Sequence, residues 1–475
     1  MTQTMPSAPQ RPGRARTRVS ASLRARLYGT VVTLTDLLPP RVRYGYVHPT
    51  TAKLLRRPLA AIPRDSPVAQ GSSTKTRAAS DMTAVTCALL TDHLDIGGIG
   101  SVIEMLAGAL AAHGVTPVIL CRGEGRRAAR LRDAGVRVES VSTMAEALAA
   151  LDAVSPDVVE LHSAPRYLEE AALTSGIPLV VALHNTEIHY TRAKWRTVQE
   201  LMTHAQASIA VSDVVRRFHA DRVPPEAAAK IVVVPNGAPP LDLAALPTRE
   251  AARARLSTAI GVPVDDDVVF VCLARYDSQK NIAGTTASFL RYLAHAERPS
   301  RLVFAGDPSD WAELRRAEAL RDEHPQGDRI HFLGNSDAST LLRAADGFLL
   351  NSFFEGWPVA ATEAVSAGVP IILSEMGGAA ELVRTAAPGS SMIPNPSGDA
   401  AAVSDAAVRR ARRSSRTQPN AQEFARAAVA LAQIPPRGTR AGDELPDTAD
   451  VMAAEHAAIL RAARGGIEPE GAASA

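Results

Sequence analysis

The stretch AVTCALLTDHLDIGGIGSVIEMLAGALAAHG, residues 84–114, joins an apolar run of strand length to a segment of helical periodicity through a glycine-rich turn. The same alternation continues through TPVILC, GRRAARLRDAG and VRVESVS, and it restarts at VVFVCLARY after a polar, proline-containing interval. Strands that alternate with helices are typical of a parallel sheet covered on both faces. The sequence therefore predicts an α/β protein with two Rossmann-like, doubly wound domains.

The expected domain boundaries follow these changes in pattern. With 475 residues the chain can bury two ordinary cores. Residues 82–240 are expected to form the first Rossmann-like domain and residues 266–400 the second, joined by a linker over 241–265. Residues 401–475 are expected to form a helical tail, and residues 1–81 a basic, flexible N-terminal arm.

The charge of the chain is divided unevenly. Residues 1–80 hold 14 Lys and Arg against two Asp and Glu, whereas the remainder holds 38 against 48. Such an arm is expected to be solvated or to contact an anionic membrane, outside the catalytic machinery. The segment RLYGTVVTLTDLLPPRV leaves open a fold against the body. Nucleic acid is a disfavoured partner because it would rest on the arm alone.

Cysteine usage and hydropathy bear on the compartment. Cys87, Cys121 and Cys272 are scattered in or beside apolar runs, which favours reduced core thiols and a cytoplasmic location. No apolar stretch approaches the roughly 18 to 20 residues that span a bilayer, and the basic start lacks the apolar segment of a secretory signal. We expect a cytoplasmic protein and leave peripheral membrane contact open.

Two cations follow the first strand of the second predicted domain. Arg275 and Lys280 lie in LARYDSQKN, at the carboxyl end of a parallel strand, where ligands of such sheets bind. Arginine can hold a diphosphate with two hydrogen bonds, and lysine adds a point charge. The alternative is a pair of solvated loop cations.

Two carboxylates lie in NSFFEGWPVAATEA. Because Pro358 suits the first position of a helix, Glu355 is expected in the preceding loop and Glu363 two turns along the helix. A fixed carboxylate accepts hydrogen bonds from sugar or ribose hydroxyls without having to titrate. The alternative is two surface glutamates on an amphipathic helix.

Two glycine-rich turns are further candidates for the ligand site. Gly98, Ile99 and Gly100 precede a predicted helix whose N-terminal N–H groups could face an anion, and Gly377 and Gly378 introduce another helix in the same way. The first turn does not match G-x-G-x-x-G, and both also fit ordinary tight turns.

Histidines end two predicted strands of the first domain. His184 follows PLVVAL and His162 ends DVVELH, so either would face the ligand-binding edge of the sheet. A structural hydrogen-bonding role is the alternative to a role in catalysis.

Taken together, GGIGS, HNTEIH, VVPNG, ARYDSQKN and SFFEGWPVAATEA, in this order over residues 83–385, resemble the retaining GT-B glycosyltransferases of family four. The resemblance implies two domains facing across a cleft, with a nucleotide-diphosphate-sugar donor held mainly by the second and a hydroxyl acceptor held mainly by the first. It implies a co-substrate but no cofactor, and no metal ion. The identity of the acceptor stays open, and the basic arm leaves a lipid-linked acceptor open as well.

The resemblance also implies roles for single residues. Arg275 and Lys280 would stabilise the diphosphate as the anomeric bond breaks, Glu355 would orient the hexose, and His184 would lie beside its reactive face. The implied donor-binding residues are Gly98, Ile99, Gly100, Glu363, Gly377 and Gly378. Front-face attack, in which the departing phosphate oxygen accepts the acceptor's proton, explains retention without a protein nucleophile.

Other functions remain open on the same fold. A sugar-nucleotide epimerase or a phosphorylase is one alternative, and a catalytically silent sugar-nucleotide-binding partner subunit is another. Neither the sugar nor the acceptor is marked by a motif.

Overall fold

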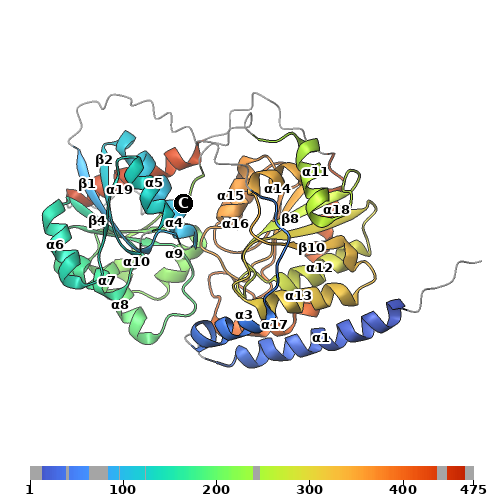
Figure 1. Cartoon of the computed structure of the whole chain (residues 1–475). Coiled ribbons are helices and arrows are strands. Elements are labelled where there is room, and N and C mark those ends of the chain that lie inside the picture. Colours follow the sequence, from blue (N-terminus) through green and yellow to red (C-terminus); the bar gives the residue numbers. More distant parts are fainter. Residues whose placement is uncertain are drawn as a thin grey trace, which may run out of the picture. The chain divides into compact units, whose positions relative to one another are not determined.

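The computed structural model (Figure 1) describes residues 13–38, 42–63, 84–95, 97–123, 125–238, 246–435 and 447–465. The chain divides into two compact units. The first unit takes in the residues up to Pro63, Arg249–Asn351 and Ala406–Pro435, and the second takes in Arg64–Thr248, Ser352–Asp405 and the residues from Pro436 onward.

A seven-stranded sheet forms the centre of the second unit, in the order β3-β2-β1-β4-β5-β6-β7. Its strands are β1 (Val85–His93), β2 (Val115–Gly123), β3 (Arg137–Ser140), β4 (Val158–His162), β5 (Leu179–Leu183), β6 (Ala207–Ala210) and β7 (Ile231–Val233). Each neighbouring pair is parallel. The strand order reverses at β1, which pairs with both β2 and β4, and ligands of such sheets bind at the carboxyl edge beside this switch.

Helices cover this sheet and form two apolar layers with it. The helices of the second unit are α4 (Gly97–Ala109), η2 (Leu110–His113), α5 (Arg126–Asp133), α6 (Met144–Val154), α7 (Arg166–Thr174), α8 (Arg192–His204), α9 (Asp213–Ala220), α10 (Pro225–Ala228), α15 (Val359–Ser366), α16 (Ala379–Thr385) and α19 (Thr448–Arg464). One layer joins β1 to α4 and α19, and the other joins β4 and β5 to α6, α7 and α8. Several of these helices begin at a side-chain cap, as at Ser212, whose hydroxyl accepts from Val215 N.

The second sheet has six strands in the order β10-β9-β8-β11-β12-β13. They are β8 (Val268–Leu273), β9 (Ser300–Ala305), β10 (Ile330–Leu333), β11 (Gly347–Leu350), β12 (Ile371–Ser374) and β13 (Ser391–Ile393). The boundary between the two units divides this sheet, because β8 to β11 belong to the first unit whereas β12 and β13 belong to the second. The predicted α/β class, with two doubly wound sheets, is confirmed.

The first unit holds the other helices of the described residues. They are α1 (Gly13–Thr35), η1 (Arg43–Val47), α3 (His48–Leu55), α11 (Arg249–Ile260), α12 (Ile282–Leu293), α13 (Trp311–Glu323), η3 (Gly327–Arg329), α14 (Ala338–Ala344), α17 (Asp405–Arg413), η4 (Ser415–Thr417) and α18 (Ala421–Ala432). Within the described part of the chain, no helix combines the length and the apolar character that crossing a membrane requires. The three cysteines are buried, as expected of core thiols.

The described part of the N-terminal arm differs from the flexible segment expected from its charge. Residues 13–38 and 42–63 form helices and an extended stretch of the first unit, and α1 packs against α13. Asp36 is buried and pairs with Arg43, at 2.8 Å, and with Arg412 of α17. Net charge did not reveal this arrangement because it depends on one acidic residue meeting partners far along the chain. The rest of the expected arm lies outside the described residues.

Candidate functional site

His184 lies at the carboxyl edge of the seven-stranded sheet of the second unit, beside the end of a neighbouring strand. It follows β5 directly, and β5 pairs in parallel with β4, which ends at His162. His162 Nδ1 is 2.8 Å from His184 Nε2, and the two rings stack with centroids 5.1 Å apart. Parallel pairing thus brings together the two strand-end histidines that the sequence places in separate motifs.

A buried carboxylate lies behind this histidine pair. Glu160 of β4 is fully buried, and its Oε1 lies 2.8 Å from His456 Nδ1 of α19 and 3.4 Å from His162 Nε2. Burial raises the pKa of Glu160, but the charges and hydrogen bonds of His456 and His162 outweigh it and hold that pKa below its usual range. Glu160 is therefore an ionised group that acts on the histidines.

One hydrogen bond joins the pair. His162 Nδ1 and His184 Nε2 share it, and which of the two nitrogens donates depends on the tautomers of the rings. Burial, and next the charge of His162, lowers the pKa of His184 well below its usual range. The arrangement presents a neutral imidazole whose other ring nitrogen, Nδ1, can form a hydrogen bond with a hydroxyl group.

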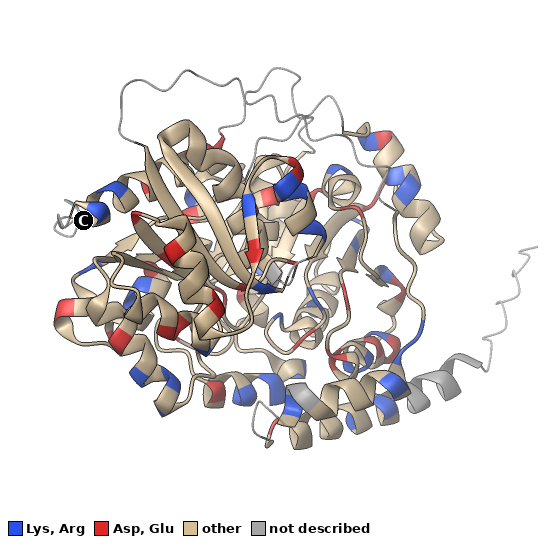
Figure 2. Cartoon of the chain, turned by 60° about the vertical axis from the view of Figure 1, so that its left-hand side comes forward, with Lys and Arg blue, Asp and Glu red and all other residues tan. Residues whose placement is uncertain are grey.

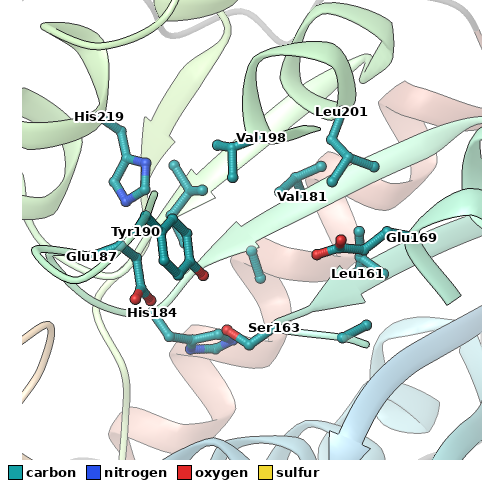
Figure 3. Close-up of a pocket in the computed structure, with 13 residues that line it drawn as sticks. Leu161, Ser163, Glu169, Val181, His184, Glu187, Tyr190, Val198, Leu201 and His219 are labelled. Atoms are coloured by element: carbon teal, nitrogen blue, oxygen red, sulfur yellow. The ribbon is translucent and has the colours of Figure 1, made fainter. Parts of the chain in front are cut away.

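A pocket adjoins His184 (Figure 3), and its residues all belong to the second unit. It is lined by Leu161, Ser163, Ala164, Glu169, Val181, Ala182, Leu183, His184, Glu187, Tyr190, Val198, Leu201 and His219. Burial raises the pKa of Glu187 to about 7, against the opposing effects of Lys194 and of the Tyr190 hydrogen bond. Burial also lowers the pKa of His219 to about 4, although its Nε2 lies 3.1 Å from Asn185 O.

The sequence alone does not reveal that these two titratable groups line one pocket. Glu187 lies inside the motif HNTEIHY, so its position was visible, but its burial was not. His219 is on α9 and no spacing relates it to that motif.

The loop after β11 meets the His184 loop within the second unit. A Cβ atom at Gly356 would lie 1.7 Å from His184 O. Only glycine, which has no Cβ atom, therefore lets the backbones of the two loops come this close. Glu355, the preceding residue, is 5% exposed. The contact therefore brings the predicted carboxylate loop and the predicted histidine into one region.

The second glycine turn packs on the same loop. Gly377 has a φ of +44°, and Gly378 N donates to Gly356 O at 3.1 Å. A Cβ atom at Gly378 would lie 2.1 Å from the Trp357 ring. The turn has the predicted position, but the Gly378 amide already donates within the protein, which differs from the expectation that both amides face a ligand.

The first glycine turn is also determined by packing. A Cβ atom at Gly100 would lie 1.7 Å from Leu94 O, so glycine allows α4 to start close to the end of β1. Ile99 packs against the apolar layer beneath the helix, whereas Gly98 is exposed, with its Cβ position 3.7 Å from Val359 Cγ2. Of the three predicted residues, Gly98 is the exposed one.

Glu363 lies nearer the helix start than expected. Pro358 is the N-cap of α15, so Glu363 is the fifth residue of that helix, just over one turn from its start rather than two. Its side chain is partly exposed.

Arg275 and Lys280 belong to the first unit, in the loop between β8 and α12. Arg275 Nη2 is 3.1 Å from Asp277 Oδ2, and the Arg275 side chain is 55% exposed. The other Asp277 oxygen accepts from Gln279 N at 3.0 Å and from Lys280 N at 3.2 Å. Tyr276 is fully buried beneath the loop. One aspartate thus fixes the loop that carries both predicted cations.

Two family descriptions match most of the two sheets. The model described as glycosyl transferases group 1 matches residues 257–424, and the model described as Glycosyltransferase Family 4 matches residues 96–240.

Curated relatives match shorter parts of the chain. The D-inositol 3-phosphate glycosyltransferase of Mycobacterium tuberculosis is 34% identical over 142 residues, which cover 29% of this chain and 27% of the relative. The O-antigen biosynthesis glycosyltransferase WbnH of Escherichia coli is 33% identical over 102 residues, which cover 20% of this chain and 30% of the relative. The chain spans 27% to 55% of the length of such relatives.

Solved structures share the fold. HepE of Anabaena, solved in complex with UDP-glucose, superposes with a TM-score of 0.56 at 18% identity and covers 78% of this chain and 99% of its own. Sucrose-phosphate synthase of Thermosynechococcus elongatus gives a TM-score of 0.52 at 19% identity and covers 73% and 96%.

Proposed function

Because the chain belongs to the glycosyl transferases of group 1, we propose that it moves a hexosyl unit from a nucleotide-diphosphate sugar to an acceptor hydroxyl with retention of anomeric configuration and without a metal ion. The UDP-glucose complex of HepE supports the choice of a nucleotide sugar as donor.

The observation that carries the proposal is the convergence at His184. The Gly356 backbone touches His184 O, and Gly378 N donates to Gly356 O, so the histidine, the Glu355 loop and the second glycine turn form one region. A hexose binds by hydroxyl groups that both donate and accept. A buried carboxylate at Glu355 offers acceptors to such hydroxyls, and the neutral imidazole of His184 offers a ring nitrogen.

The bond changes need no protein nucleophile. The bond from the anomeric carbon to the β-phosphate oxygen breaks, and that oxygen keeps the electron pair. The acceptor oxygen bonds to the same face of the anomeric carbon, and its proton passes to the departing phosphate. Arg275 and Lys280 would stabilise the growing diphosphate charge, and Glu363 would accept from the ribose hydroxyls.

The acceptor is proposed to be a hydroxyl group on a lipid-linked molecule, which the enzyme meets at an anionic membrane surface. Support comes from the basic N-terminal region, since Lys and Arg near an anionic leaflet favour binding to it.

A donor panel tests the function. Purified protein is incubated with UDP-, GDP- and ADP-hexoses, and hydrolysis or transfer is followed with product NMR, with and without excess EDTA. We expect one donor class to be turned over, with the anomeric configuration retained in the presence of EDTA. Inversion, or activity lost in EDTA and restored by Mg²⁺, would contradict retention or metal independence. Donor binding without turnover would favour a silent partner subunit, and conversion of the sugar without transfer an epimerase.

A further inference from the structure

Large exposed hydrophobic side chains are concentrated at the start of the described chain. Those with substantial exposure are Leu23, Leu27, Leu34, Leu37, Val42, Tyr46, Leu54, Met392 and Val451. All but the last two lie in the N-terminal segment that packs onto the first unit. An exposed leucine alone needs no explanation, but a cluster within one segment marks a contact surface.

The leucines of α1 lie along one face of the helix. Leu23, Leu27 and Leu34 are four and seven residues apart, which places them on one stripe, and Leu37 continues it in the turn after the helix. Their exposed fractions are 71%, 59%, 60% and 61%. We name these four residues the leucine ridge.

The opposite face of α1 is already used. Ala25 and Val32 are 4% and 2% exposed, and α1 packs against α13. The helix is therefore anchored by small side chains on one side while the leucine ridge points away from the unit. Figure 1 shows α1 along the margin of the first unit, beside α13.

The charge of α1 indicates what would cover the ridge. Its sequence contains no acidic residue, and its two arginines with described side chains, Arg24 and Arg26, are exposed. Figure 2 shows blue and no red along its described length. Among these arginines, the Arg24 side chain is 53% exposed and its Nη2 lies 3.9 Å from Asp322 of α13. A second copy of the chain, meeting ridge to ridge, would bring like charges together, whereas an anionic lipid surface offers both apolar chains and phosphate groups.

We propose that the leucine ridge, with Arg24 and Arg26, forms a surface that binds an anionic lipid bilayer, with the helix parallel to the membrane plane. The leucines enter the boundary between headgroups and acyl chains, and Arg24 and Arg26 extend to the phosphates. Because α13 holds the other face, binding requires no unfolding of the unit. The proposal rests on the membrane contact in the proposed function and names the surface that makes it, but it does not depend on the chemistry of glycosyl transfer.

The test measures partition of the whole protein onto vesicles of phosphatidylcholine with and without phosphatidylglycerol. The wild type is expected to bind the anionic vesicles and to be released as KCl is raised. A variant combining Leu23→Ser, Leu27→Ser and Leu34→Ser should bind about a hundredfold more weakly, because three inserted side chains are lost. Val451→Ser, which removes an exposed hydrophobic residue of α19, is the matched control and should bind like wild type.

Each other outcome overturns the proposal. Wild-type protein that ignores anionic vesicles at low salt, or a triple variant that binds them unchanged, removes the lipid surface as the occupant. A triple variant that turns a dimer into a monomer with vesicle binding intact assigns the ridge to a second copy. A triple variant with a lowered thermal midpoint assigns it to another segment of this chain. Transfer to a soluble acceptor is measured separately, so failure of the proposed function is distinguishable.

Discussion

Arg275 and Lys280 share a loop whose shape is fixed by Asp277, so either side chain can be removed without releasing the loop. If they stabilise charge that grows as the diphosphate departs, Arg275→Ala or Lys280→Ala should lower kcat about a hundredfold, or about 3 kcal/mol. Steady-state kinetics with the preferred donor measures this. Arg291→Ala, an exposed cation of α12, is the control. Rates near wild type in both loop variants would remove the diphosphate role.

The two glutamates should give separable defects. Glu355 is buried in the loop that touches His184, whereas Glu363 is partly exposed on α15. Glu363→Gln should weaken binding of the nucleoside diphosphate with or without its sugar. Glu355→Gln should impair use of the sugar donor and leave nucleoside diphosphate affinity almost unchanged. Calorimetric titration with both ligands decides, and identical defects in the two variants would contradict the assignment.

Burial of His219 makes stability depend on pH. Its pKa is about 4 in the folded protein and about 6.5 when unfolded, so the unfolded chain takes up a proton that the folded chain refuses. The contribution of the neutral His219 to the free energy of unfolding is present above pH 6.5 and is lost as the pH falls toward 4. The loss between pH 7 and pH 5 amounts to about 2 kcal/mol. Urea unfolding should show a smaller loss for His219→Gln than for wild type. His204→Gln, at an exposed site on α8, should keep the wild-type loss.

The histidine pair shows how far residue patterns reach. Two strand-final histidines could be predicted to face the ligand edge, and parallel pairing of β4 with β5 brings His162 and His184 to 2.8 Å. The carboxylate behind them could not be predicted, because Glu160 lies inside a strand and its closest partner, His456, comes from the far end of the chain. No local spacing connects residues so distant in sequence.

At the scale of elements, the glycine turns were predictable in position but not in use. Glycine before a helix indicates that another group approaches the backbone closely, and a Cβ atom at Gly100 or Gly378 would indeed clash with a neighbouring group. The approaching groups are protein atoms, Leu94 O and the Trp357 ring. Sequence cannot tell a turn tightened for a ligand from one tightened for a neighbouring strand or side chain.

Docking of α1 onto the first unit rests on a buried ion network. Asp36 is 1% exposed and pairs with Arg43 and Arg412, each 3% exposed. Arg412 also lies 3.0 Å from Glu313. Burial lowers the pKa of Arg412, but Glu313 and Asp36 outweigh it and raise that pKa. Arg412 is therefore charged inside the protein and depends on these carboxylates.

Asp36→Asn should therefore lower the free energy of unfolding by about 3 kcal/mol, because it leaves buried arginines without a full counter-charge. Asp322→Asn is the matched control. Asp322 is 35% exposed and lies 3.9 Å from Arg24, so this change should cost less than about 1 kcal/mol. Urea unfolding of the two variants measures the difference. Equal, small effects would mean that the network does not anchor α1.

For the whole molecule, the alternation of strands and helices was enough to predict two parallel sheets, but not which sheet each terminal helix would cover. The tail was predicted to be helical, and α17, α18 and α19 are helices. The chain sends α18 to the first unit and α19 to the second, where Met452 and Leu460 join the apolar layer of β1. An apolar helix face identifies a buried helix, while its partner depends on tertiary geometry.

The N-terminal segment differs most between the expectation from sequence and the structure, and its removal would test which of the two holds. As a solvated arm, it could be removed without loss of stability. In the structure, Gly334 N donates to Ala60 O at 2.7 Å, Ile62 N donates to Ser336 Oγ at 3.1 Å, and Asp36 compensates Arg412. A chain that begins at Ala84 loses all three interactions together with the contact of α1 on α13.

We expect the protein lacking residues 1–83 to unfold at a lower urea concentration than full-length protein, by more than Asp36→Asn alone, because hydrogen bonds and apolar contacts are lost along with the ion pairs. The urea concentration at the unfolding midpoint should therefore be highest for the wild type, lower for full-length Asp36→Asn, and lowest for the truncated chain. Circular dichroism and fluorescence during urea titration give the order. A truncated protein with the wild-type midpoint would show that the segment is an appendage after all, and vesicle binding by that same protein would remove α1 as the lipid-binding surface.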